Sequence, residues 1–112
     1  MAKKTFTLMG FIIATLRRAS YRWPARSECM KKSRIRRGFY RCAICGNEVQ
    51  KKNMALDHVM PIVPVTGWDS YDGFIRRLFC EVGGFQTICK DPCHQAKTNI
   101  ENAERRKNKN TQ

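Results

Sequence analysis

Four of the six cysteines form two close pairs, and no other feature constrains the fold of this 112-residue chain as strongly. Cys42 and Cys45 form a C-x-x-C pair, and Cys89 and Cys93 form a second pair after 43 intervening residues. Zinc binds four thiolates tetrahedrally, and each close pair supplies two of them from one turn. The spacing therefore predicts a structural zinc site, worth on the order of 10–16 kcal/mol to folding. Two disulfides are the alternative that six cysteines allow.

Basic residues are concentrated in the first part of the chain. The formal net charge is +13, and residues 1–41 contain twelve lysines and arginines against a single acid, Glu28. A basic surface without a partner would normally alternate with acids, so this segment indicates a polyanionic partner, either nucleic acid or an anionic membrane surface. We expect a phosphate-binding extension. Its candidate DNA contacts are Arg17, Arg18, Arg22, Arg26, Lys31, Lys32, Arg34, Arg36 and Arg37.

The apolar run at residues 6–16 follows two lysines, as in the start of a secretory signal. Gly10 interrupts this run, Arg17 follows it directly, and it is far shorter than the ~20 residues that cross a bilayer. We therefore expect a cytoplasmic protein without a membrane partner. The spacing of the apolar residues predicts an amphipathic helix over 8–20, and Pro24 is suited to begin a second helix over 24–33.

The remainder of the chain is predicted to alternate short strands with helices. Gly46 and Asn47 favour a hairpin turn at the first cysteine pair. Strand-like alternation covers 54–63 and 85–89, and a longer helix is expected from Asp91 to about Arg106. A short helix over 74–79 lies between the strands. Its side chains that we expect in the core are Phe74, Ile75, Leu78 and Phe79.

Two further motifs accompany the cysteine pairs: Asp57-His58-Val-Met-Pro between them, and His94-Gln-Ala-Lys97-Thr directly after Cys93. In this order, residues 39–106 resemble the HNH endonucleases, especially the small zinc-bearing versions of phages and prophages. In that family a ββα-metal unit cuts DNA with one divalent cation. The resemblance implies an α+β fold. Its parts would be a basic, mainly helical DNA-binding extension (1–38), a ββα-metal core with a structural zinc knuckle (39–106) and a flexible tail (107–112).

The resemblance also implies roles for single residues. His58 would be the general base, because an imidazole that titrates near neutral pH can take a proton from water. Asp57 and His94 would bind the catalytic cation, which is Mg²⁺, Mn²⁺ or another transition metal. Lys97 is a further candidate contact to DNA phosphates. The structural zinc would be bound by Cys42, Cys45, Cys89 and Cys93.

One position departs from the family pattern. Gly84 stands before Phe85-Gln86 where the family has its middle asparagine, a residue thought to support the loop of the general base. We expect a metal-dependent DNA endonuclease, encoded by a phage or prophage, that nicks DNA or cuts both strands. A terminase or other packaging protein is a partner that the family suggests. The alternative is a non-catalytic zinc-containing module that binds DNA, and size and charge alone also allow an RNA-binding zinc ribbon.

Overall fold

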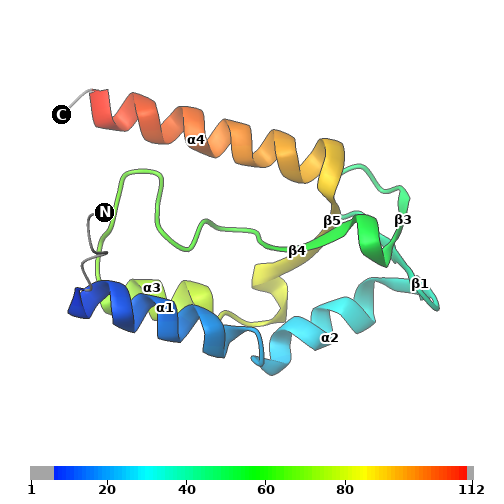
Figure 1. The fold of residues 1–112 in the computed structure, drawn as a ribbon. Helices are drawn as coiled ribbons and strands as arrows, with labels where there is room; N and C mark the ends of the chain where they lie inside the picture. The colour runs from blue at the N-terminus through cyan, green and yellow to red at the C-terminus, as the bar shows by residue number, and fades with distance from the viewer. Residues whose placement is uncertain (1–6, 111–112) are drawn as a thin grey trace, which may run out of the picture.

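The computed structural model describes residues 7–110, which form an α+β fold of helices around two small antiparallel sheets (Figure 1). The α-helices are α1 (Leu8–Ser20), α2 (Pro24–Ser33), α3 (Tyr71–Leu78) and α4 (Gln95–Asn110). The strands are β1 (Arg34–Arg36), β2 (Phe39–Arg41), β3 (Glu48–Gln50), β4 (Met54–His58) and β5 (Phe85–Cys89). Short helical turns are η1 (Lys51–Asn53), η2 (Val82–Gly84) and η3 (Lys90–His94). The first six residues of the expected extension and the last two of the expected tail lie outside the described residues.

Both N-terminal helices have the predicted bounds, and local sequence explains why. The Thr7 side chain caps α1 by accepting a hydrogen bond from the Gly10 amide at 2.9 Å. Pro24 occupies the first turn of α2, where its missing N–H is not needed. Ala25 and Cys29 of α2 are buried against Phe85 of β5. The second helix of the expected extension therefore shares a core with the second half of the chain.

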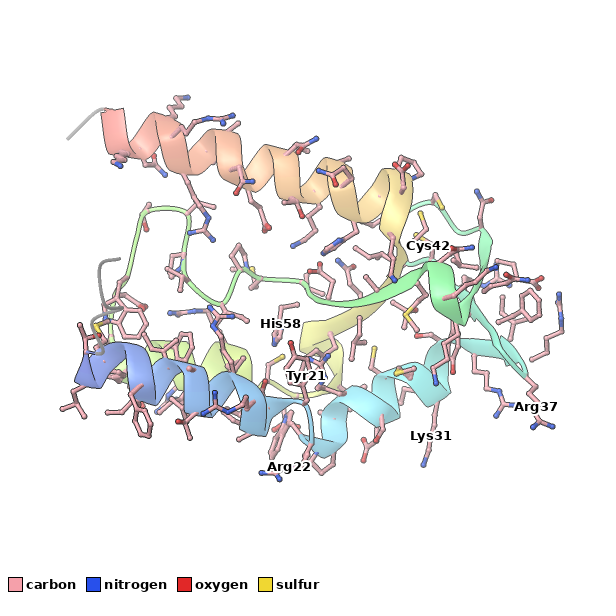
Figure 2. All side chains as sticks on the ribbon, viewed as in Figure 1. Tyr21, Arg22, Lys31, Arg37, Cys42 and His58 are labelled. Carbon is pink, nitrogen blue, oxygen red and sulfur yellow. The ribbon has the colours of Figure 1, made fainter. Side chains whose placement is uncertain are left out.

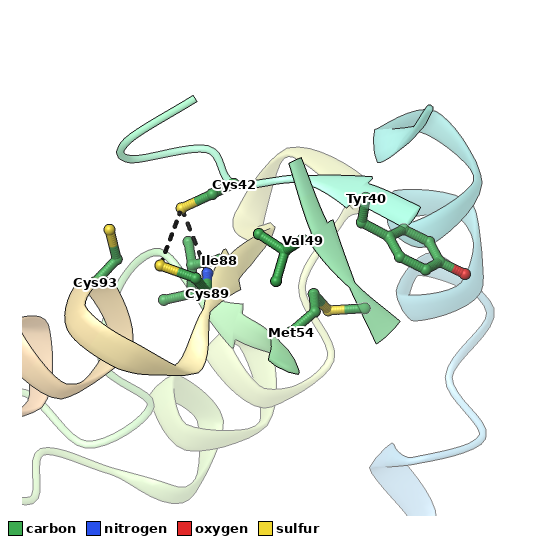
Figure 3. Close-up of a cluster of buried hydrophobic side chains, with 7 residues drawn as sticks. All are labelled: Tyr40, Cys42, Val49, Met54, Ile88, Cys89 and Cys93. Atoms are coloured by element: carbon green, nitrogen blue, oxygen red, sulfur yellow. Dashed lines mark hydrogen bonds between the residues drawn. The ribbon is translucent and has the colours of Figure 1, made fainter. Parts of the chain in front are cut away.

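The two sheets meet at the cysteine pairs. In β4–β5, Met54 pairs with Cys89 at one end and His58 pairs with Phe85 at the other. The predicted hairpin at the first cysteine pair is confirmed as β2–β3, and the predicted strand over 85–89 is confirmed as β5. Thr87 of β5 donates its hydroxyl to the Arg41 carbonyl at 2.8 Å, which ties one sheet to the other. The core between them consists of Tyr40, Val49, Met54 and Ile88 with three of the cysteines (Figure 3).

β4 ends at His58, although the alternation predicted a strand as far as residue 63. Val59 still donates a hydrogen bond to the Gly84 carbonyl at 2.9 Å, but Pro61 has no N–H with which to continue the ladder. The chain then runs as a loop between α4 on one side and α1 and α3 on the other (Figure 1).

The short helix begins earlier than predicted, at Tyr71 instead of residue 74. The reason is a cap: the Ser70 hydroxyl accepts a hydrogen bond from the Gly73 amide at 3.0 Å. Phe74 is 1% exposed and Leu78 is 2% exposed, as expected of core residues. The expectation for Ile75 was wrong, because this side chain is 41% exposed on the outer face of α3.

The last helix also differs from the prediction. Asp91 has non-helical backbone angles, so regular α-helix begins only at Gln95. It then continues to Asn110, beyond the expected end at Arg106. Side chains near the C-terminal end of α4 contact the loop that follows β4. Arg105 donates to the carbonyls of Val63 and Pro64, and Asn108 donates to that of Val65.

Within the described residues, no helix combines the length and the apolar composition that a bilayer crossing requires.

Candidate metal centre and candidate active site

The four paired cysteines converge at one point between the two sheets. Their sulfur atoms all lie within 4.8 Å of one another, and the Sγ atoms of Cys42 and Cys89 are 3.9 Å apart (Figure 3). Zn–S bonds of about 2.3 Å place the sulfurs of a tetrahedral site about 3.8 Å apart. All six cysteines are free thiols, which favours a metal over the two-disulfide alternative. The predicted cluster is confirmed, and its donor set can hold a metal such as zinc.

Two turns bring these sulfurs together. Cys42 and Cys45 lie in the β2–β3 turn, which is closed by a 2.9 Å hydrogen bond from the Gly46 amide to the Cys42 carbonyl. Gly46 has a φ of +77°, a left-handed conformation that glycine adopts without strain. Cys89 ends β5, and Cys93 lies in the turn before α4. The site therefore joins the hairpin to the start of the last helix.

The backbone favours one thiolate before any metal binds. Burial opposes ionisation of Cys42, but the amides of Cys45 and Cys89, 3.5 and 3.4 Å from its sulfur, outweigh burial and lower its pKa to about 6. Hydrogen bonding with the Cys89 side chain, followed by burial, raises the pKa of Cys93 to about 12. Metal binding must therefore release protons, and metal affinity must rise with pH.

Asp57 and His94, the predicted ligands of the catalytic cation, are brought together by β4 and the turn before α4. Asp57 Oδ1 lies 3.8 Å from His94 Nε2. Two ligands of one cation, each bonded at about 2.1 Å, must lie within about 4.2 Å of each other, so the pair fits a shared divalent ion. The other carboxylate oxygen is held by Gln86 Nε2 and Lys97 Nζ, each at 3.1 Å.

His58 faces the opposite side of β4 from Asp57, as the alternation of a strand predicts. Its Nε2 donates a hydrogen bond to the Leu78 carbonyl at 3.0 Å, and its ring packs 4.7 Å from the ring of Phe85. A carbonyl oxygen can only accept, so Nε2 bears the proton and Nδ1 is the nitrogen free to accept one. Burial lowers the pKa of His58 below its ordinary 6.5, the bond to Leu78 opposes this shift, and the charge of Arg26 adds to it.

A cavity of about 480 Å³ extends around the end of β4 and reaches both residues. Asp57 and His58 border it together with the loop after β4 and the inner face of α4. Figure 2 shows His58 in this interior position, between α1 and α4. The full lining consists of Arg17, Asp57, His58, Pro61, Ile62, Val63, Lys97, Glu101 and Arg105.

Lys97, predicted as a phosphate contact, is bound within the protein. Its ammonium lies 3.1 Å from Asp57, 3.0 Å from Glu101 and 3.1 Å from the His58 carbonyl. Burial opposes the charge of Lys97, but the hydrogen bonds to Glu101 and then Asp57 raise its pKa. Its observed role is to hold Asp57 and the end of β4. Sequence reasoning missed Glu101, although its spacing of four from Lys97 on a helix was a usable indication.

The basic residues of the first part of the chain are divided between surfaces. Figure 2 shows Arg22, Lys31 and Arg37 pointing outward, away from His58. Arg26 stacks over Phe85, 5.6 Å from the ring centroid, and so lies on the side of β5 near His58. Arg17 alone of the predicted contacts in α1 and α2 borders the cavity. The other exposed members of the set are Arg18, Lys32, Arg34 and Arg36, the last paired with Glu48.

Packing explains why glycine occupies position 84. A Cβ atom built there would lie 2.5 Å from the Cys80 sulfur, so an asparagine does not fit unless Cys80 moves. The backbone at this position still supports the strand end, because its carbonyl accepts the bond from Val59. This contact uses the backbone alone and requires no side chain at position 84.

Neither a protein-family model, nor a curated protein, nor a solved structure matches this chain. The resemblance to HNH endonucleases therefore rests on the motifs of the chain itself.

Proposed function

We propose that this protein is a metal-dependent DNA endonuclease. The main support is that Asp57 and His58 border one cavity from opposite faces of β4, while His94 lies beside Asp57. A phosphodiester hydrolase needs a base for the attacking water and a cation at the scissile phosphate. His58 has an accepting Nδ1 for the first task, and the Asp57–His94 pair has the donor atoms for the second.

The residues would divide the reaction between them. His58 Nδ1 takes the proton of the attacking water, and the Leu78 carbonyl orients the ring and stabilises its protonated form. Gln86 and Lys97 hold one oxygen of Asp57, so the other oxygen is presented next to His94. When bound there, a divalent cation neutralises charge on the phosphate and on the departing oxygen.

We propose zinc for the four-cysteine centre and a ββα-metal core for the surrounding fold. The antiparallel pair β4–β5 followed by α4 supports this assignment, because Asp57 and His58 come from the first strand and His94 from the start of the helical segment. His94 directly follows Cys93. A metal at the cysteines would therefore also fix the position of His94.

A non-catalytic DNA-binding module is the second candidate. One observation favours it: the Lys97 ammonium already occupies an oxygen of Asp57, at 3.1 Å, and a cation there competes with a metal. In that case the exposed basic residues would bind phosphates, and the half-buried ion pairs of Lys97 would only stabilise the fold.

Cleavage of supercoiled plasmid separates the two candidates. We expect purified protein to relax or linearise plasmid with Mg²⁺ or Mn²⁺ and to leave it intact with chelator. His58→Ala should reduce the rate by about 10²–10⁴, the usual contribution of a general base. DNA binding in a gel shift should persist, and circular dichroism should show that the variant is folded.

Equal cleavage by His58→Ala would contradict the assignment and indicate a contaminating nuclease or another base. Binding without cleavage in every metal would favour the DNA-binding module.

A further inference from the structure

Three cationic side chains border the cavity, and two of them are fully engaged within the protein. Lys97 is paired with Asp57 and Glu101. Arg105 donates through both terminal nitrogens to carbonyls of the loop after β4, at 3.1 and 2.7 Å. Arg17 differs. Among residues 7–110, its guanidinium makes no ion pair or hydrogen bond, and its contact is with the face of the Phe74 ring, 5.5 Å from the centroid.

The position of Arg17 is built by packing. Phe74, the ring beneath its guanidinium, is 1% exposed and therefore cannot move aside. Trp68 also packs on this ring, with the centroids 5.2 Å apart. α1 itself contacts α3. Stacking on an aromatic face leaves the planar N–H donors of an arginine free for other acceptors.

Arg17 lines the same cavity as Asp57 and His58, the proposed base. A guanidinium that has no carboxylate partner among residues 7–110 and borders this cavity has donors that can bind two phosphate oxygens together.

We propose that Arg17 binds a phosphate oxygen of the DNA strand at the reaction centre, inside the cavity that Asp57 and His58 border. The inference rests on the proposed function and deepens it, because it moves this residue from a general phosphate-binding surface to the site of reaction. The first helix is then part of the catalytic unit. The outward-pointing arginines and lysines serve affinity alone.

The test compares Arg17→Ala and Arg17→Lys with Arg76→Ala. Arg76→Ala is a suitable control, because it removes the same charge from a side chain of α3. That side chain is 79% exposed and lies outside the cavity. Single-turnover cleavage at saturating protein measures the chemical step, and a gel shift measures affinity. Melting curves establish that each variant is folded.

We expect Arg17→Ala to reduce the single-turnover rate by about 10²–10³, the usual effect of removing a donor to developing charge. Its affinity should fall less than tenfold, because the outward basic residues remain. Arg17→Lys should recover part of the rate, since a lysine keeps the charge but loses the paired donors. Arg76→Ala should cleave at the rate of the wild type.

If wild type cleaves and Arg17→Ala matches Arg76→Ala, the inference is overturned while the endonuclease stands. If none of the metals tested allows the wild type to cleave DNA, the proposed function fails and the inference fails with it.

Discussion

The four-cysteine centre and the cavity lie at opposite ends of the β4–β5 pair but are built in different ways. At one end Met54 pairs with Cys89, beside the sulfur cluster, and at the other His58 pairs with Phe85, beside the cavity. The four cysteines come from two pairs that are each close in sequence, and three of the four are buried. The cavity is open, and its walls come from α1, β4, the following loop and α4.

We expect the cysteine centre to contribute mainly to stability and the cavity to contain the groups that perform the chemistry. A tetrahedral site can stabilise a fold by an amount as large as the whole free energy of unfolding of a small domain, about 5–15 kcal/mol. The cavity has half-buried ion pairs and a lowered histidine pKa, arrangements typical of functional sites. Changes at the cysteine end should therefore unfold the protein, and changes at the cavity end should leave it folded.

The largest effect is expected at the cysteine end. Cys42→Ser, or removal of the metal with a strong chelator, should unfold the chain, because a zinc centre supplies on the order of 10–16 kcal/mol. Circular dichroism and metal analysis by mass spectrometry would measure the loss. DNA cleavage and DNA binding should disappear together.

Cys80→Ala is the matched control for that experiment, because this cysteine lies outside the cluster. Its metal content should equal that of the wild type. A Cys42→Ser protein that keeps its fold without metal would show that the four-cysteine centre is not required for folding.

An intermediate effect is expected at Gly84, near the cavity end. Gly84→Ala forces a Cβ to within 2.5 Å of the Cys80 sulfur and should destabilise the protein by about 1–3 kcal/mol, the usual cost of overpacking. Urea denaturation measures this change. Gly83→Ala is the control, because no atom lies within 4 Å of its added Cβ. Equal stabilities for the two variants would contradict the packing explanation of this glycine.

The smallest effect is the pH dependence caused by His58. Its pKa in the folded protein lies below 6.5, mainly through burial, so the unfolded chain binds the proton more readily. Its contribution to stability is complete above pH 6.5 and is lost as the pH falls toward the folded pKa. Cleavage should decline over the same range, because the base must be neutral. The comparison of wild type with His58→Gln in denaturation at several pH values measures the difference.

If the difference in stability between the wild type and His58→Gln does not change with pH below 6.5, the lowered pKa of His58 is contradicted.

Local features of the sequence predicted much of this structure. The cap at Thr7 and the proline at position 24 set the starts of α1 and α2, and both signals act within one helical turn. The start of α3 was missed because Ser70 was not recognised as its cap. The end of α4 was missed for another reason: Asn108 contacts a loop that is distant in sequence.

The sequence alone determined the four-cysteine cluster, the two N-terminal helices and the alternation of Asp57 with His58, because each depends on spacing within a turn or a strand. Only the tertiary structure decided which charges meet. Lys97 is bound to Asp57, whereas Arg17 has no ion pair among residues 7–110 and borders the cavity of His58, because these contacts are set by the packing of α1 and α4 around β4. Long-range packing has no periodic trace in sequence, so those contacts could not be predicted from it.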